Sequence, residues 1–203
     1  GALLGAWPTD RFGRKKTLMW IGVLYFVSAL GSAFATDAYT FMIARFIGGV
    51  GIGVSTVAAP LYISEIAPAD KRGRLAGMFQ FNIVFGILVA FLSNFLLGGI
   101  GENAWRWMMG VEALPALIYT VMCFGIPESP RWLIGKRGER AEGLRVLALV
   151  RPDDSEEALE AKADEIAAAS ETTPGKSKFW TKRLKIPIAL AFFIAFFNQL
   201  SGI

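Results

Sequence analysis

Long apolar runs constrain the fold of this chain more than any other feature. Each run covers about 18–24 residues, which is long enough for an α-helix to cross a bilayer. Three runs carry no charged residue and two carry one each. The runs are Thr17–Ala35, Thr40–Ile63, Leu75–Leu97, Trp107–Ile126 and Ile186–Ile203. We therefore expect an all-α membrane protein with four full transmembrane helices. We expect two truncated ones at Gly1–Trp7 and Ile186–Ile203.

The connections between these runs differ in charge. Nineteen of the 21 Lys and Arg residues fall in Asp10–Lys16, Ser64–Arg74 and Pro127–Lys185. The two other connections, residues 36–39 and 98–104, carry one charged residue each, Asp37 and Glu102. Basic loops remain on the cytoplasmic side of membranes. We predict a multi-pass protein of the plasma membrane with its basic loops in the cytoplasm, and the net charge of +4 is no indication of nucleic-acid binding.

The composition excludes several kinds of site. There is no histidine and Cys123 is the only cysteine, so histidine catalysis, a histidine metal site and a disulfide scaffold are excluded. The spans also lack paired acids. We therefore expect that the protein is not an enzyme and that it has no catalytic residue, metal site or cofactor.

The segment Pro127–Lys185 is predicted to be a helical piece outside the membrane. Ser129 can cap a helix that has Pro130 at its first position. A second helix can start at Asp154, with Glu157 as its capping-box partner. Its apolar stripe consists of Leu159, Ala163, Ile166 and Ala167. From the pattern alone the segment is either a solvated connector or a bundle that braces two membrane halves. The expected domains are residues 1–126, 127–185 and 186–203.

Two charges lie inside the predicted spans. Arg45 and Glu112 each lie about five residues from the outer end of their helices, so they share a depth at which they can neutralise each other. Gly49 and Gly53 lie on the face of Arg45, which turns that face towards packed protein. The pair either fixes the packing or is linked to protons and gating.

Uncharged amides are the other polar groups in the spans. Gln80 and Asn94 share one helix face, and Asn198 and Gln199 form a second site in the last run. Amides both donate and accept hydrogen bonds, as a sugar hydroxyl requires. The alternative is hydrogen bonding between helices.

Several motifs resemble those of the sugar porter family of the major facilitator superfamily. The first is Asp10-Arg11-Phe12-Gly13-Arg14-Lys15, which drug exporters share. The more specific motifs are Pro127-Glu128-Ser129-Pro130-Arg131-Trp132-Leu133 and Gln199-Leu200-Ser201-Gly202-Ile203. The resemblance covers the whole chain and implies a partial fold, from the end of helix two to the start of helix seven of twelve. Helices 1 and 8–12 would then belong to the same polypeptide.

The resemblance also implies roles for single residues. Gln80, Ile87, Asn198 and Gln199 match sugar-binding positions, although Asn198 stands where relatives usually have glutamine. Arg45 and Glu112 match residues of proton-coupled members. A cytoplasmic gate is implied for a set of charged residues and one turn glycine. This set is Asp10, Arg11, Gly13, Arg14, Glu65, Arg72, Glu128 and Arg131.

The resemblance implies transport of a monosaccharide across the lipid bilayer by alternating access, with proton symport favoured by Glu112. A sugar facilitator and a non-transporting sugar sensor of the same fold remain alternatives.

Overall fold

The computed structural model describes residues 1, 5–68, 71–171, 189–190, 193 and 196–197, and this part of the chain is helical without strands. Residues 1–167 form one compact unit and residues 168–203 a second. In the second unit, the rings of Phe193 and Phe197 stack with their centroids 6.3 Å apart.

Ten helical segments follow one another in the first part of the chain. They are α1 (Ala6–Phe12), α2 (Arg14–Ala33), α3 (Ala38–Ile66), α4 (Arg72–Leu97), α5 (Ala104–Gly110), α6 (Ala113–Gly125), α7 (Pro130–Trp132), the π-helical turn η2 (Leu133–Arg137), α8 (Arg140–Val150) and α9 (Glu156–Glu171).

Four segments are long and apolar enough to span a membrane. They are Arg14–Ala33, Ala38–Ile66, Gly73–Leu97 and Ala104–Gly125. These segments match the four full spans predicted from the sequence. The truncated span at Ile186–Ile203 falls mostly outside the described residues.

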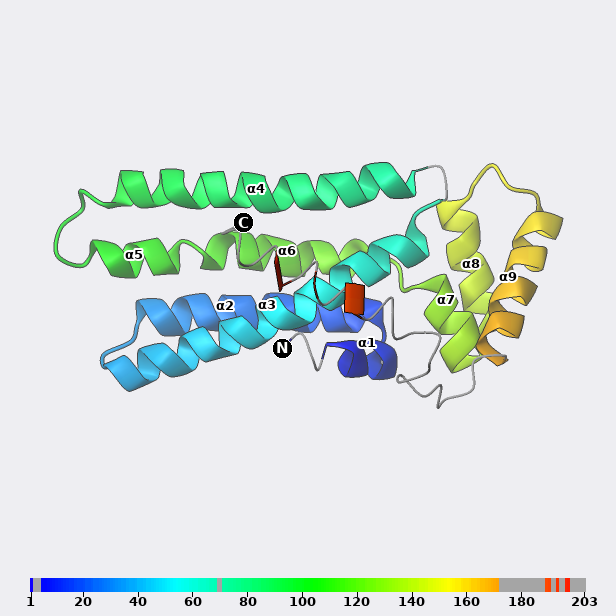
Figure 1. Ribbon diagram of the computed structural model, residues 1–203, viewed down its shortest axis with the longest axis horizontal. Helices are drawn as coiled ribbons and strands as arrows, with labels where there is room; N and C mark the ends of the chain where they lie inside the picture. Colours follow the sequence, from blue (N-terminus) through cyan, green and yellow to red (C-terminus); the bar gives the residue numbers. More distant parts are fainter. Residues whose placement is uncertain (2–4, 69–70, 172–188, 191–192, 194–195, 198–203) are drawn as a thin grey trace. The chain divides into compact units, whose positions relative to one another are not determined.

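The helix α2 packs against both α3 and α6, and the three run lengthwise together (Figure 1). The buried core between them contains Leu18, Ile21, Val54, Ala58 and Cys123. Glycines permit the close approach. A Cβ on Gly22 would overlap Thr120, and a Cβ on Gly48 would overlap Ser28.

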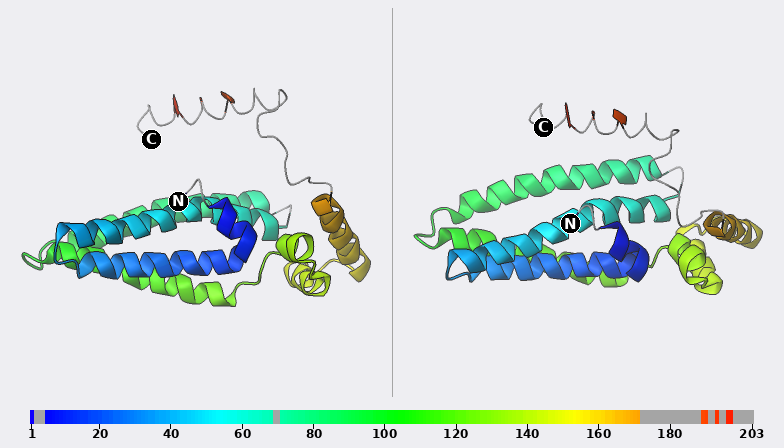
Figure 2. Two further views of the ribbon diagram at one scale, coloured as in Figure 1. Left: turned by 90° about the horizontal axis from the view of Figure 1, so that it is seen from below. Right: turned by 60° about the horizontal axis from the view of Figure 1, so that its bottom comes forward.

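The connections fall at two opposite ends of this bundle. The α2–α3 and α4–α5 loops lie at one end, and the α1–α2 turn and the α6–α7 connection lie at the other (Figures 1 and 2). The helices α7, α8 and α9 lie beyond this second end. The acidic and basic connections are therefore separated by the length of the spans.

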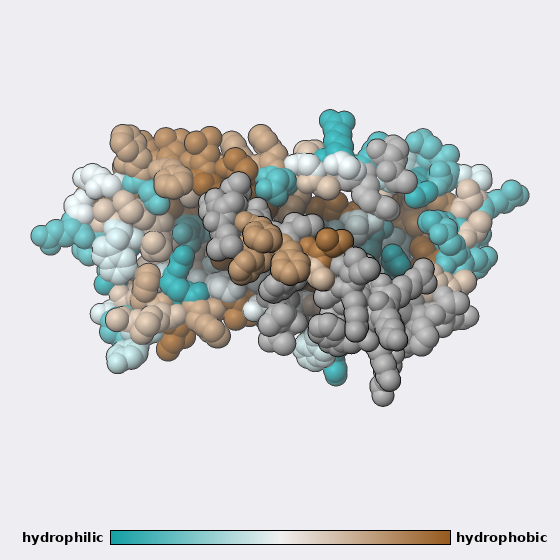
Figure 3. Space-filling model, in the orientation of Figure 1, coloured by the Kyte–Doolittle hydropathy of each residue, from teal (hydrophilic) through white to brown (hydrophobic). Residues whose placement is uncertain are grey.

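The helix α4 has no buried side chain among its described residues. Phe91 and Phe95 are 71% and 82% exposed. Apolar side chains cover its C-terminal half, and hydrophilic ones gather near α7–α9 (Figure 3). An apolar surface of this length is stable against lipid or further apolar helices, but not against water.

The span predicted as one helix at Trp107–Ile126 consists of two. The helix α5 ends at Gly110 and α6 begins at Ala113, with a turn at Val111 and Glu112. Pro115 contributes to the break, since it has no N–H to donate to the carbonyl of Val111.

The segment after α6 folds as its capping residues predict. The Ser129 side chain accepts a hydrogen bond from the N–H of Trp132, and Pro130 begins α7. The predicted stripe of α9 packs on Ile134 and Leu147 of η2 and α8. The helix α9 begins at Glu156 and not at the predicted Asp154. The hydroxyl of Ser155, rather than the side chain of Asp154, accepts the hydrogen bond from the N–H of Ala158, at 3.3 Å.

Candidate functional site

An ion pair joins α3 to the break between α5 and α6. The Nη1 atom of Arg45 lies 3.2 Å from Oε2 of Glu112 and 3.7 Å from the sulfur of Met109. The two charged side chains are 43% and 51% exposed. The charges that the sequence placed at equal depth therefore meet.

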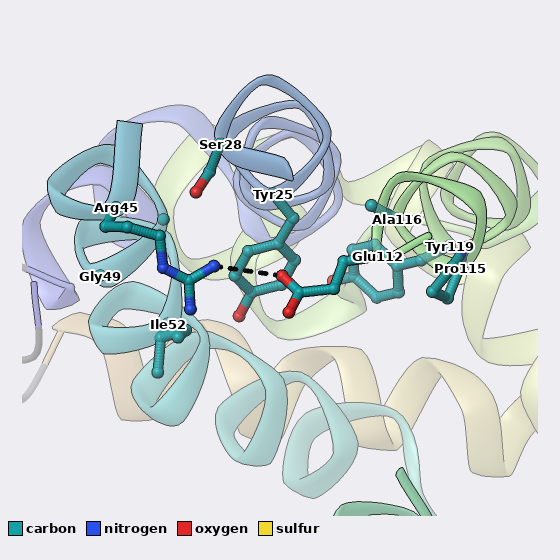
Figure 4. A pocket seen from close by; sticks show the side chains of 10 residues that line it. Tyr25, Ser28, Arg45, Gly49, Ile52, Glu112, Pro115, Ala116 and Tyr119 are labelled. Atoms are coloured by element: carbon teal, nitrogen blue, oxygen red, sulfur yellow. Dashed lines mark hydrogen bonds and ion pairs between the residues drawn. The ribbon is translucent and has the colours of Figure 1, made fainter. Parts of the chain in front are cut away.

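The pair lines a cavity of about 560 Å³ between α2, α3 and α6 (Figure 4). The hydroxyl of Tyr25 donates to the hydroxyl of Ser55 at 2.8 Å and so joins α2 to α3. Ser28 and Tyr119 add further hydroxyls to the lining. Sequence reasoning missed these hydroxyl residues, because a single Tyr or Ser in an apolar run does not reveal which helix face it occupies.

A second cluster lies where α1, α2, α3 and α7 meet. The guanidinium of Arg14 makes two hydrogen bonds to Glu65, with Nε to Oε2 at 2.8 Å and Nη2 to Oε1 at 2.9 Å. Both side chains are almost fully buried, at 7% and 4% exposure. Asp10 lies 3.2 Å from Arg14, and the carbonyl of Thr9 accepts from it at 3.1 Å. The guanidinium of Arg14 therefore contacts two carboxylates and one backbone carbonyl.

Glu128 caps the first turn of α2 from far along the chain. Its Oε1 accepts hydrogen bonds from the backbone N–H groups of Arg14, Lys15 and Ser129, at 2.8, 3.1 and 2.9 Å. Helix N-termini favour carboxylates because their first N–H groups have no partner in the helix. Gly13 has φ +95°, and a Cβ on it would overlap Oε2 of Glu128. Glycine is required at this turn for both reasons.

Side chains outside the predicted set complete this cluster around Arg14 and Glu65. Ser129 donates to Glu65 at 2.6 Å, and the indole N–H of Trp132 donates to the carbonyl of Asp10 at 2.8 Å. Lys15 donates to the carbonyl of Phe124 at 2.9 Å. Ser129 and Trp132 stand in the motif that carries the resemblance, which was the signal available in the sequence.

The structure does not bring the whole predicted gate together. Arg11 lies over the ring of Trp7, 5.5 Å from its centroid. Arg131 is exposed, and within the described residues neither of these two arginines makes an ion pair. The side chain of Arg72 is not among those that the structure describes.

The structure describes two of the four predicted sugar-binding residues. Gln80 and Ile87 lie exposed on α4 and do not line the cavity at Arg45. Asn198 and Gln199 lie outside the described residues. The binding role of all four stays a prediction.

Comparisons with known proteins show the family to which the chain belongs. The family model described as Sugar (and other) transporter matches residues 1–203. The D-xylose transporter of Levilactobacillus brevis is 35% identical over 206 residues, covering 100% of this chain and 45% of that protein. The arabinose-proton symporter of Escherichia coli is 40% identical over 160 residues, covering 79% and 33%.

A solved structure shows the same fold. It is the proton:xylose symporter XylE from E. coli bound to 6-bromo-6-deoxy-D-glucose, with 31% identity and a TM-score of 0.78. The match covers 84% of this chain and 40% of that one. The fold is thus part of a major facilitator superfamily fold.

The fold and these matches define a class, the multi-pass membrane transporters, which are not enzymes. The chain belongs to the Sugar (and other) transporter family. It spans less than half the length of the relatives it matches.

Proposed function

We propose that this chain forms part of a proton-coupled monosaccharide symporter that works by alternating access. It supplies most of the first membrane half and the beginning of the second. Helices 1 and 8–12 of the same polypeptide complete the transporter. Relatives named as xylose and arabinose transporters support a monosaccharide as substrate.

The observation that carries the proposal is the ion pair between Arg45 and Glu112. A charge inside a span costs roughly 2.5–3.5 kcal/mol on insertion scales, so such residues are usually paired and functional. In this proposal Glu112 exchanges a proton while Arg45 provides the compensating charge. The relatives named as proton symporters support this role.

The sugar site in this proposal lies at mid-membrane, between the two halves. Gln80 and Ile87 contribute to it from α4, and Asn198 and Gln199 from the last predicted span. Amide groups suit a neutral polyol because each can donate and accept. Transporters with repeated halves bind substrate at such a midplane interface.

The cluster around Arg14 and Glu65 acts as the core of the cytoplasmic gate. Arg14 and Glu65 hold the inner ends of α2 and α3 together, while Arg11 and Arg131 remain exposed for pairing with the second half. Residues 127–185 brace the two halves on the cytoplasmic side. The protein lies in the plasma membrane with its basic connections in the cytoplasm.

Replacing Glu112 in the complete transporter tests the proton role. In sealed vesicles with an imposed pH gradient, Glu112→Gln should abolish uphill accumulation of labelled xylose but preserve its exchange. Glu102→Gln removes a carboxylate from the α4–α5 loop and serves as the matched control.

Accumulation by Glu112→Gln at the wild-type level would exclude the proton role. Wild-type protein that only equilibrates xylose would indicate a facilitator, and binding without flux would indicate a sensor.

A further inference from the structure

A second cavity, of about 540 Å³, lies between α2, α4 and α5. It is next to the α2–α3 and α4–α5 connections, at the end of the bundle opposite α7, α8 and α9 (Figure 1). The helix α2 has 20 residues and is therefore about 30 Å long, which matches the hydrocarbon core of a bilayer. The cavity at its last turn thus lies at the level of the lipid headgroups.

The walls of this cavity are mostly apolar. Leu30 lines it from α2, Leu97 from α4 and Trp107 from α5. Asn103 adds an amide, and Arg106 is the one charged residue among the described residues that line it. Apolar walls favour hydrocarbon over water, and tryptophan is common where membrane spans meet the headgroups. The cavity therefore combines a surface for an acyl chain with a single cation.

Two contacts hold Arg106 beside the cavity. Its Nη1 donates to the carbonyl of Ala33 at 3.0 Å, and its guanidinium lies 4.5 Å from the ring centroid of Trp105. The ring of Trp105 in turn meets that of Phe41 edge-on, with the centroids 6.1 Å apart. A guanidinium carries five N–H donors, and the structure records one of them in a hydrogen bond. Arg106 can therefore offer further donors to an anion.

No acid in the described part of the chain forms an ion pair with Arg106. Asp37 lines a neighbouring cavity with it, but the Asp37 carboxylate accepts hydrogen bonds from Thr40. Glu102, in the α4–α5 connection, is exposed. A guanidinium matches the oxygens of a phosphate with parallel hydrogen bonds, so a cation placed at headgroup level is complementary to a lipid phosphate.

We propose that this cavity is a binding site for one phospholipid, with the phosphate on Arg106 and an acyl chain against Leu30, Leu97 and Trp107. The amide of Asn103 lies at the same site and can donate to a headgroup oxygen. The bound lipid fills the space between α4 and the pair α2 and α5. Because α4 buries none of its described side chains, this contact stabilises its place in the bundle.

Lipid affinity of the complete transporter tests the site. Delipidated protein in detergent is titrated with dioleoylphosphatidylglycerol, and native mass spectrometry gives the dissociation constant of the first lipid bound. Arg106→Gln should weaken this binding by about tenfold, because hydrogen bonds to a charged group are lost. Arg74→Gln removes an exposed arginine at the other end of α4 and should leave the constant unchanged.

A second variant tests the acyl-chain part of the site. Leu97→Trp fills the cavity but preserves Arg106 and its bond to Ala33, so it covers the case in which Arg106→Gln does not fold. It should weaken lipid binding as strongly. Leu96→Trp, at a neighbouring side chain that is 67% exposed and does not line the cavity, is the matched control.

Two further ligands distinguish a lipid from its parts. Dioleoylglycerol has the same chains without the phosphate and should bind more weakly. Glycerol phosphate has no chains and should not compete. Wild-type affinity in both Arg106→Gln and Leu97→Trp would overturn the inference, and so would equal binding of dioleoylglycerol or competition by glycerol phosphate. A wild-type transporter that binds no lipid more tightly than Leu97→Trp would show that another part of the polypeptide covers the cavity, which also overturns it.

Discussion

Arg14 of α2 and Glu65 of α3 face each other with two parallel hydrogen bonds of 2.8 and 2.9 Å, and both side chains are withdrawn from solvent. Two-point pairing of this kind fixes orientation as well as distance. Ser129 donates to the same carboxylate, so a single acid joins the start of α2, the end of α3 and the cap of α7.

Removing the charge of Glu65 should therefore destabilise the protein. Glu65→Gln leaves the guanidinium of Arg14 buried with only part of its compensation, and breaking a buried pair costs about 3 kcal/mol. We expect a clear fall in the melting temperature of the transporter in detergent. Glu102→Gln, on an exposed loop, should melt like wild type. Equal melting temperatures for the two variants would contradict the importance of the pair.

Arg131 should show the opposite behaviour. It is exposed and makes no ion pair within the described residues, so Arg131→Ala should leave the melting temperature nearly unchanged. If it pairs with the second half as proposed, its loss opens the inner gate. A cysteine introduced at Ile87 should then react faster with a cytoplasmic maleimide. The exposed Lys136→Ala is the control. Equal labelling rates in all three proteins would remove Arg131 from the gate.

Gln80 should contribute directly to sugar affinity. A hydrogen bond to a neutral group contributes about 0.5–1.5 kcal/mol, so Gln80→Ala should raise the dissociation constant for xylose by about twofold to tenfold. Asn82→Ala is the matched control, because two residues along a helix point to different faces. The measurement is calorimetric titration of the complete transporter. An unchanged constant for Gln80→Ala would exclude it as a sugar ligand.

Asp37 should make the stability of the first turn of α3 depend on pH. The hydroxyl of Thr40 donates to its carboxylate at 2.6 Å and the N–H of Thr40 at 2.9 Å, and these two bonds lower the pKa of Asp37. A lowered pKa in the folded state stabilises the protein above the unfolded value of about 3.9. This stabilisation disappears as the pH falls through the lower, folded value.

The test compares melting temperatures across pH. Asp37→Ala should melt below wild type at neutral pH, and the difference should shrink as the buffer approaches pH 3. Asp153→Ala, in an exposed turn, should show no such trend. A difference that stays constant with pH would show that the carboxylate charge is irrelevant to the cap.

Local sequence predicted the spans and the start of α7 because these depend on nearby residues. A charge-free run is sufficient to indicate a membrane helix, and Ser129 followed by Pro130 is sufficient to indicate a cap. The break at Val111 was not predicted although Pro115 was visible. Pro60 lies within a continuous helix, so the outcome depends on packing, here of Gly110 on α2 and of Arg45 across the break.

The sequence predicted which charged residues belong to the site, but not how they are arranged around a cavity. The equal depth of Arg45 and Glu112 indicated that they could meet, because depth follows from the helix rise. Their shared cavity with Tyr25 and Tyr119 could not be predicted, since it depends on how three helices rotate against one another. The same holds for Lys15 and Phe124, which come together only after α2 and α6 have packed.

The cap that Glu128 places on α2 has a consequence for how the protein is made. The N–H groups of Arg14 and Lys15 belong to the first span here, but their acceptor lies 114 and 113 residues further along the chain. During synthesis α2 must enter the bilayer with its first turn uncapped and wait until three more spans have been inserted. The contact between the first turn of α2 and Glu128 can therefore form only after the three following spans have been synthesised, and until then water is the partner of these N–H groups.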